Sequence, residues 1–307
     1  MALDIYHHSP IHHAMLADEV RNRAFRCALE RSVTRDDVVL DVGAGSGALS
    51  IWAAQAGARR VYAVERSAAA AALARANTRA FGGRIRVLEG DIAEVELPEP
   101  VDLIVSEWLG AFGIDENLLG MVLLARDRWL RPGGRVLPAR VTALAAPVCN
   151  SRLLTTRMPG TGAAAGGPLR WSQAGLSAKV LLGLPQTMWC TDLAALPARQ
   201  AQLPFRARLQ WTAQHDGVVD GTVAWFEAEF GDGTQLTNAP GAPATHWGQF
   251  VFALEPALPV RSGQEITLEI ASIPAAPGFC HHAWSVRIAD GPWQHHDTRG
   301  QASMVWP

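Results

Sequence analysis

The stretch VLDVGAGSGALS, residues 39–50, decides the fold of the first half of this chain of 307 residues. A run of mostly apolar residues predicts a strand, a helical segment ends the stretch, and Gly43, Gly45 and Gly47 lie between the two. Glycine lets the backbone approach a ligand closely, and the first turn of the following helix offers free N–H groups. The stretch therefore predicts a strand, a ligand-binding turn and a helix in succession.

Strands and helices alternate outward from this turn. Further strands are predicted at residues 60–65, 85–91, 101–107 and 131–138. Helices are predicted at residues 47–57, 67–83 and 116–130, with Gly57 as the residue that ends the first of them. Such alternation is typical of a parallel, doubly wound sheet. We therefore expect residues 1–138 to form one domain built on a parallel sheet.

The pattern changes after about Pro138, where apolar and polar residues begin to alternate. One predicted strand places on a single face Ala224, Phe226, Ala228 and Phe230. Similar segments are residues 246–254, 264–270 and 283–290. This two-residue period predicts mostly antiparallel β structure for residues 139–307. A segment at about residues 151–200 interrupts these strands and contains a Gly- and Ala-rich connection.

Charge and composition exclude several classes of protein. The formal net charge is −2 and charged residues make up 18% of the chain, so no overall signature of binding to nucleic acid or an anionic membrane is present. No apolar run is long enough to span a bilayer, and the N-terminus lacks the features of a signal peptide. The four cysteines are scattered without a CxxC pair, which indicates reduced thiols in a cytoplasmic protein, and we expect no metal site.

Two acids sharpen the prediction for the ligand of the glycine turn. A glycine-rich turn alone is shared by NAD, FAD and S-adenosylmethionine sites. The spacing here is G-x-G-x-G with Asp41 before the first glycine, which suits S-adenosylmethionine better than a pyrophosphate. Glu65 ends the next strand, where a carboxylate can accept hydrogen bonds from both ribose hydroxyls. We therefore expect S-adenosylmethionine, against the alternative of an ordinary turn with a solvated acid.

The loop SEWLGAFGIDE, residues 106–116, places Glu107 and Glu116 in mostly apolar surroundings after a predicted buried strand. A buried carboxylate is costly unless it is paired or hydrogen-bonded. At the carboxyl ends of the strands, this loop would lie beside the sulfonium methyl of the cofactor. Guanidinium is planar and offers a fork of donors that two carboxylates can grip, so the loop favours a guanidinium substrate.

Four segments together resemble the protein arginine methyltransferases. Residues 39–65 resemble the cofactor segment of that family, and residues 106–134 resemble its double-glutamate loop with the helix that follows. Residues 11–25 resemble the helix placed over the cofactor, and residues 244–252 contain Thr-His-Trp, the short signature of the family's barrel domain. The resemblance implies a Rossmann-type class I methyltransferase domain followed by a β-barrel-like substrate domain.

The resemblance also implies a site for S-adenosylmethionine. The residues assigned to it are Tyr6, Met15, Arg21, Asp41, Gly43, Gly45, Gly47, Glu65 and Ile92. Arg21 would hold the cofactor carboxylate, Glu65 would take the ribose, and Met15 would lie beside the transferring methyl. From the residues alone, Met15 could equally be core packing, and Arg21 with Asp18 could form a surface pair on one helix.

The substrate side of the site follows from the same resemblance. The residues assigned to the arginine are Tyr6, Glu107, Trp108, Glu116 and Trp247. Glu107 and Glu116 would grip the guanidine, and removing either charge is expected to abolish methyl transfer while sparing cofactor binding. Asp18 and His246 would pair across the domain junction as a route for the proton that the product loses. A single His on a strand is, however, more often a structural hydrogen-bonding group.

The identity of the substrate stays open at this point. The arginine could belong to a protein or peptide, or be free arginine or a small arginine-like metabolite. The alternatives are a methyltransferase for another amine or amidine and a non-catalytic S-adenosylmethionine-binding interaction protein. A homodimer is expected from the family's habit and from the insertion, whose apolar residues would form a sizeable patch if exposed. The alternative is that this segment folds onto its own barrel. The patch residues are Leu181, Leu182, Leu184, Met188 and Trp189.

Overall fold

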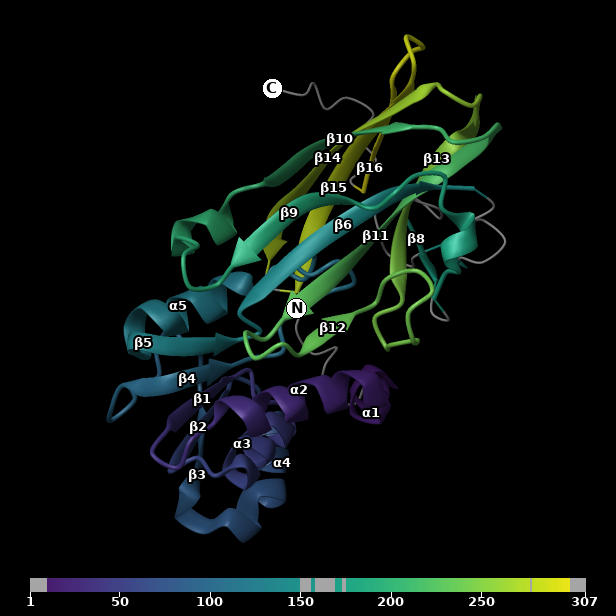
Figure 1. Cartoon of the computed structure of the whole chain (residues 1–307). Coiled ribbons are helices and arrows are strands. Elements are labelled where there is room, and N and C mark those ends of the chain that lie inside the picture. The colour runs from purple at the N-terminus through teal and green to yellow at the C-terminus, as the bar shows by residue number, and fades with distance from the viewer. Residues whose placement is uncertain (1–9, 150–155, 158–168, 173–174, 277, 299–307) are drawn as a thin grey trace.

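The computed structural model describes residues 10–149, 156–157, 169–172, 175–276 and 278–298 (Figure 1). Helices and a parallel sheet form one end of the molecule, and long antiparallel strands extend away from it. No helix within these ranges is long and apolar enough to cross a membrane. Tyr6, to which the sequence assigns cofactor and substrate contacts, lies outside the described residues.

The first half forms a five-stranded parallel sheet, as the alternating pattern predicts. Its order is β3-β2-β1-β4-β5. The strands are β3 (Ile85–Glu89), β2 (Arg60–Glu65), β1 (Val38–Val42), β4 (Val101–Val105) and β5 (Leu130–Leu137). Every residue of β1 and β4 is buried, and the helices α3 and α5 pack against these strands. The strand order reverses between β1 and β4, which are parallel neighbours, and this makes the carboxyl ends of these two strands the expected ligand site.

The helices of this half lie near the predicted ranges, although the helix predicted at residues 67–83 is α-helical only to Thr78 and is followed by a 3₁₀ segment. They are α1 (Pro10–Ala17), α2 (Glu19–Ser32), α3 (Ala48–Ala56), α4 (Ala68–Thr78), the 3₁₀ segment η2 (Arg79–Arg84) and α5 (Leu119–Trp129). Gly57 ends α3 with φ +114°, which confirms its predicted role as a stop. Helix α5 begins at Leu119 rather than at Glu116, because Asn117 has φ +53° and cannot continue a right-handed helix.

The second half forms two antiparallel sheets. One has the order β7-β8-β13-β11-β6-β9 with β12 paired to β11, and the other has the order β10-β14-β15-β16. The first sheet contains β7 (Thr156–Arg157), β8 (Leu169–Ser172), β13 (Gln249–Val260), β11 (Gly217–Glu229), β6 (Arg140–Val148), β9 (Gln186–Asp192) and β12 (Gln235–Thr237). The second contains β10 (Phe205–Thr212), β14 (Glu265–Ala276), β15 (Phe279–Ile288) and β16 (Gln294–Asp297). Short 3₁₀ segments are η4 (Ala178–Val180) and η5 (Ala198–Gln202).

One hydrophobic core joins the two halves. The ring of Phe112, from the loop after β4, lies 5.9 Å from that of Trp189 and 5.6 Å from that of Phe252, both in the second half. Phe25 of α2 packs edge-on against Phe230, with ring centroids 5.0 Å apart. The loop after β4 is therefore packed between the two halves, and its conformation depends on both.

The apolar insertion folds onto its own chain, which is the alternative to an exposed patch. Strand β9 pairs with β6, so Met188 and Trp189 pack into the core with 6% and 9% of their surface exposed. Leu182 is also buried, and Leu181 is partly buried. Of this group Leu184 is the residue that is well exposed, at 71%. The apolar sequence of this segment is explained by folding onto its own chain, and any argument for self-association has to come from elsewhere.

Candidate active site

The sheet brings the glycine turn and the double-glutamate loop together. The turn follows β1 and the loop follows β4, and these strands are paired neighbours. The hydroxyl of Ser106, the first residue after β4, donates a hydrogen bond to the carbonyl oxygen of Val42 at 2.7 Å. This bond joins the carboxyl ends of β4 and β1. The predicted cofactor and substrate segments thus meet at the carboxyl ends of the strands, as ligand sites do in open parallel sheets.

The glycine turn has the backbone of a ligand cradle. Gly43, Gly45 and Gly47 have φ of +73°, +54° and +82°, a region that L-residues with side chains rarely adopt. A Cβ on Gly47 would lie 3.2 Å from the Thr78 side chain, whereas a Cβ on Gly43 would meet nothing within 4 Å. Gly47 is therefore required for packing, and Gly43 leaves open space above the turn.

Glu65 is held at the mouth of this turn. Its carboxylate accepts the backbone N–H of Gly45 at 2.8 Å through Oε2 and that of Ser67 at 2.8 Å through Oε1. The side chain is anchored by two bonds at the end of β2, and each carboxylate oxygen keeps acceptor capacity for a ligand. This geometry agrees with a carboxylate set to receive paired hydroxyl groups.

Asp41 is completely buried beneath the turn. Its Oδ2 accepts the Ser50 hydroxyl at 2.6 Å, while its Oδ1 is buried without a hydrogen-bond partner. Burial raises the pKa of Asp41 to about 7, against the opposing effect of the Ser50 hydrogen bond. A buried carboxylate oxygen without a partner is costly, so this position fits a ligand that carries a cationic or donor group.

Asp18 joins the N-terminal helices to the second half. It separates α1 from α2, and its Oδ1 caps α2 by accepting the backbone N–H of Arg21 at 2.9 Å. Its Oδ2 lies 2.8 Å from both the backbone nitrogen and Nδ1 of His246. The predicted contact between Asp18 and His246 is therefore confirmed. Although burial raises the pKa of Asp18, the bonds from His246 and Arg21 outweigh it and lower the pKa below its ordinary value. Met15 is partly buried in the last turn of α1.

Glu107 already holds a guanidinium, that of Arg21. Nη2 of Arg21 lies 3.2 Å from Oε2 of Glu107, and each side chain is only 7% exposed. Oε1 of Glu107 accepts the backbone N–H of Leu109 at 3.0 Å. The sequence treats Arg21 and Glu107 as members of separate cofactor and substrate sites, whereas in the structure they form one buried pair. The two sites therefore share this contact.

The loop is closed by a third acid that the sequence analysis misses. The carboxylate of Asp115 accepts the N–H groups of Ala111 and Phe112, each at 3.0 Å, and Gly110 and Gly113 exchange backbone bonds at 3.1 Å. A Cβ on Gly110 would collide with the Asp115 carboxylate. Burial raises the pKa of Asp115 to about 6, although the bonds from backbone N–H groups lower it. A third acid in an apolar loop is the signal that could have identified it.

The second half fixes the same loop from outside. Nδ2 of Asn238, at the end of β12, donates to the carbonyl oxygens of Ala111 at 2.7 Å and Gly248 at 2.6 Å. Its Oδ1 accepts the N–H of Phe226 at 2.9 Å. Trp247 donates from Nε1 to the carbonyl oxygen of Leu109 at 2.6 Å. Asn238 carries no local sequence signal, because its partners are distant in the chain.

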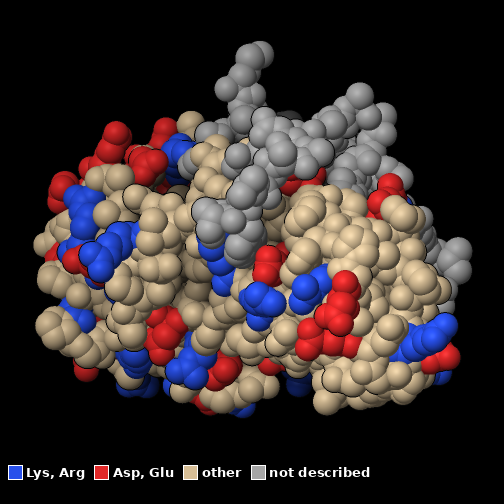
Figure 2. All heavy atoms as spheres, turned by 90° about the horizontal axis from the view of Figure 1, so that it is seen from above, with Lys and Arg blue, Asp and Glu red and all other residues tan. Residues whose placement is uncertain are grey.

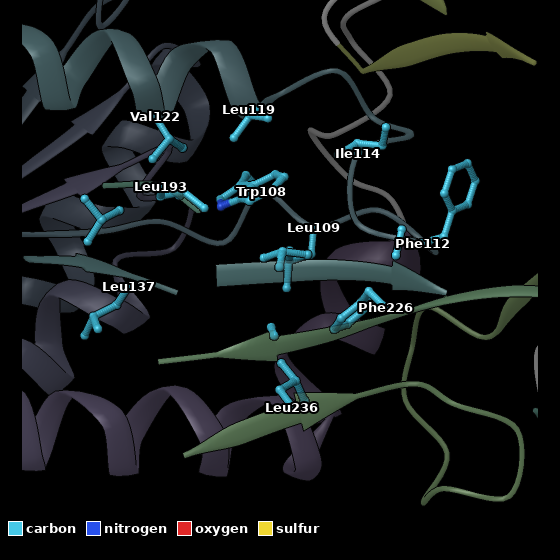
Figure 3. Close-up of a cluster of buried hydrophobic side chains, with 14 of the residues drawn as sticks. Trp108, Leu109, Phe112, Ile114, Leu119, Val122, Leu137, Leu193, Phe226 and Leu236 are labelled. Carbon is cyan, nitrogen blue, oxygen red and sulfur yellow. The ribbon is translucent and has the colours of Figure 1, made fainter. Parts of the chain in front are cut away.

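The remaining predicted residues that the structure describes are Trp108, Ile92 and Glu116. Trp108 is 1% exposed, and its ring lies among Leu119, Val122 and Leu193 in a hydrophobic cluster (Figure 3). Ile92 is also buried. Glu116 is partly buried at the end of the loop, where its carbonyl oxygen accepts the N–H of Gly278 at 2.7 Å. Contact of Trp108 and Ile92 with ligands stays a prediction.

Comparisons with known proteins agree with this architecture. Residues 39–134 match a family model described as a methyltransferase domain. Residues 174–287 match a model described as the arginine methyltransferase oligomerization subdomain. A parallel-sheet domain with a glycine cradle, followed by antiparallel sheets that fix the loop after β4, defines the chain as a methyltransferase of two-part architecture.

Individual relatives narrow the class. Protein arginine N-methyltransferase 1.1 of Arabidopsis thaliana is 35% identical over 280 residues, covering 86% of this chain and 71% of that protein. Protein arginine N-methyltransferase 1 of Schizosaccharomyces pombe is 32% identical over 287 residues, covering 89% and 84%. The Trypanosoma brucei PRMT1 enzyme-prozyme heterotetrameric complex with AdoHcy has a similar structure, with TM-score 0.80, 27% identity and coverage of 96% and 98%. The chain belongs to the protein arginine N-methyltransferase family, and the resemblance noted in the sequence is confirmed.

Proposed function

We propose that Glu107 and Glu116 hold an arginine guanidinium while Arg21, Asp41, the glycine turn and Glu65 hold S-adenosylmethionine. Family membership makes the reaction the S-adenosylmethionine-dependent methylation of an arginine guanidino nitrogen. The observation that carries the assignment of residues is the buried pair of Glu107 with Arg21. It supports a guanidinium site at this carboxylate, because a guanidinium is already accommodated there with little solvent exposure.

The described residues fit the proposed cofactor. The open space above Gly43 provides a cradle for the cofactor. Oδ1 of Asp41, which has no hydrogen-bond partner, could accept a bond from its ammonium group. The anchored carboxylate of Glu65 could accept bonds from its ribose. When bound, S-adenosylmethionine supplies an electrophilic methyl group on a sulfonium. Arg21 would hold the cofactor carboxylate, and in doing so it would have to share or release its bond to Glu107.

Electrostatics explain why two carboxylates are needed. A sulfonium and a guanidinium repel by about 4 kcal/mol at ~4 Å with an effective dielectric constant of 20. Glu107 and Glu116 offset this repulsion, orient the guanidine plane and draw positive charge toward the nitrogens that they hold. Asp18 holds Nδ1 of His246, which leaves Nε2 as the ring nitrogen to accept the proton that the product loses.

For the substrate we propose an arginine in a protein or peptide, because the relatives are named protein arginine N-methyltransferases. Free arginine and another amine are the alternatives. Acidic and basic side chains are interspersed on the face seen in Figure 2, and the net charge is −2, which agrees with a partner other than nucleic acid. The match to an oligomerization subdomain supports a homodimer. We place the domain boundary at Pro138, between β5 and β6, and the cytoplasmic location stays a prediction.

Radiolabelled methyl transfer tests the proposal. Purified protein is incubated with methyl-labelled S-adenosylmethionine and, separately, with free arginine, arginine peptides, matched lysine peptides and proteins of a cell lysate. Label in arginine peptides or lysate proteins, recovered as methylarginine, is the expected result. Label in free arginine alone would replace the proposed substrate class. Label in lysine or no label anywhere, from protein that binds S-adenosylhomocysteine, would contradict the function.

A further inference from the structure

The residue after Glu116 has an unusual backbone conformation. Among the described residues, Asn117 and Ala289 are the non-glycine residues with positive φ, at +53° and +47°. Asparagine adopts this left-handed region more readily than most residues. At Asn117 the chain leaves the double-glutamate loop and enters α5, so the conformation of this residue sets the direction in which the loop ends.

The turn between β14 and β15 holds this end of the loop. Nδ2 of Asn117 donates to the carbonyl oxygen of Ala276 at 3.1 Å. In the opposite direction, the N–H of Gly278 donates to the carbonyl oxygen of Glu116 at 2.7 Å. Below them, Sγ of the buried Cys280 contacts the carbonyl oxygen of Ile114 at 3.5 Å. The carbonyl oxygen of Glu116 and the side chain of Asn117 are thus bound to one hairpin, with Asn117 and Ala276 159 positions apart in the chain.

Hydrogen bonds hold the chain at both glutamates. Glu107 is fixed through its carboxylate, by Arg21 and by the N–H of Leu109. At Glu116 the carbonyl oxygen accepts the N–H of Gly278, next to the side-chain bond of Asn117 to the same hairpin. A displacement of about 1 Å at a reacting centre can cost a factor of about 100 in rate, so a fixed backbone at Glu116 has consequences for catalysis.

We propose that Asn117 is a positioning residue for Glu116, and that it acts with Gly278 by clamping the loop end to the β14–β15 turn. The proposal rests on the proposed role of Glu116 in gripping the guanidine. Asn117 contributes a left-handed backbone and an amide donor, and Gly278 contributes a backbone donor at φ +84°. Together they set where the Glu116 carboxylate stands relative to Glu107 and the cofactor.

Variants at Asn117 separate its two contributions. Asn117→Gly keeps access to the left-handed backbone but removes the amide donor, and Asn117→Ala removes both. We expect kcat/KM for an arginine peptide to fall roughly 5- to 10-fold in the first and further in the second. Affinity for S-adenosylhomocysteine, measured by calorimetry, should stay within about twofold, since the contacts of Asn117 lie away from the glycine turn. Ala289→Gly is the control at the other left-handed residue and should change neither quantity.

A second pair of variants tests the turn itself. Gly278 and Gly263 both have φ +84°, and a Cβ on either would meet nothing within 4 Å. Alanine at each position therefore introduces the same backbone strain without a clash. Gly278→Ala should raise KM for the peptide and lower kcat, whereas Gly263→Ala, in the turn between β13 and β14, should leave both unchanged at a similar loss of thermal stability.

A double-mutant cycle with Glu116→Asp distinguishes positioning from general stability. If Asn117 acts through Glu116, Asn117→Gly should cost less in the Glu116→Asp background than in the wild type. Equal costs in both backgrounds, or a loss of activity that follows cofactor affinity and unfolding temperature, would overturn the inference. Normal kcat/KM in Asn117→Ala, with Glu116→Gln inactive, would overturn this inference alone. Normal turnover by Glu116→Gln would remove the proposed role of Glu116 and this inference with it.

Discussion

The glycine turn and the double-glutamate loop meet at the same edge of one sheet, yet they are built in different ways. The bonds that shape the turn join residues close in sequence, such as Glu65 to Gly45, 20 positions apart. The loop has local bonds from Asp115, but it is also held by the second half, through Trp247 to Leu109, 138 positions apart, and Asn238 to Ala111, 127 apart. The proposed cofactor end therefore depends mainly on local bonds, whereas the proposed substrate end also depends on the packing of the second half against the first.

The largest effect expected from this comparison is that of Glu107→Gln. Loss of one charge from a desolvated clamp should cost roughly 3–5 kcal/mol, or about two to nearly four orders of magnitude in methyl-transfer rate. Because Glu107 also pairs with Arg21, cofactor affinity should shift as well. The control is Glu99→Gln, which removes a carboxylate paired with Arg59 at 2.9 Å on the surface. Rates near wild type in Glu107→Gln would show that the loop does not hold the substrate through this charge.

The cofactor end carries a pH dependence of its own. The pKa of Asp41 is raised to about 7 in the fold and is near 3.8 when unfolded, so its contribution to stability is complete below pH ~4 and is lost as the pH rises through about 7. In the ligand-free protein, the stability gained by Asp41→Asn over wild type should grow between pH 5 and 7 by roughly 1.4 kcal/mol per pH unit and then level off. Chemical denaturation at several pH values measures this difference. A difference in unfolding free energy that does not change with pH would contradict the raised pKa of Asp41.

Methyl transfer should depend more strongly than cofactor binding on contacts made by the second half. Asn238→Ala removes the bonds to Ala111 and Gly248 and leaves the N–H of Phe226 buried without an acceptor. We expect a loss of roughly 1–3 kcal/mol of unfolding free energy and a fall in methyl transfer larger than any change in cofactor affinity. Gln186→Ala, which removes an exposed amide bond to the carbonyl oxygen of Gln210, is the matched control. Equal losses of cofactor affinity and transfer would mean that the two ends are not separable.

A surface contact between the halves should matter least. Arg31 of α2 lies 3.7 Å from Asp232, and its side chain is 62% exposed. Such a pair contributes about 0–1 kcal/mol because solvent screens it. Arg31→Ala should therefore leave methyl transfer unchanged and move the unfolding temperature very little. A marked loss of activity would show that surface charges, rather than the buried contacts around the loop, couple the two halves.

The local end of the site is also the end that the sequence predicts well. The strand, turn and helix around Asp41, the stop at Gly57 and the place of Glu65 all follow from short-range patterns. Asn238 and the hairpin contacts to Asn117 depend on which distant segments meet, and periodicity carries no such information. The contact between Asp18 and His246 came from the family resemblance, since neither residue has a local signal. The sequence left open whether the apolar insertion packs onto its own chain or onto a partner, because its pattern is the same in both cases.

We expect cofactor binding and methyl transfer to depend on different residues. This is tested most directly by measuring S-adenosylhomocysteine binding by calorimetry and the methyl-transfer rate on the same preparations of Glu65→Ala and Glu116→Gln. Glu65→Ala should bind S-adenosylhomocysteine at least about tenfold more weakly, because charge-assisted bonds contribute about 1.5–3 kcal/mol, and should recover its rate at saturating S-adenosylmethionine. Glu116→Gln should bind it within about twofold of wild type and transfer methyl groups at least about a hundredfold more slowly. Near-normal turnover by Glu116→Gln on an arginine substrate, or unchanged binding by Glu65→Ala together with tight NADH binding, would contradict the account.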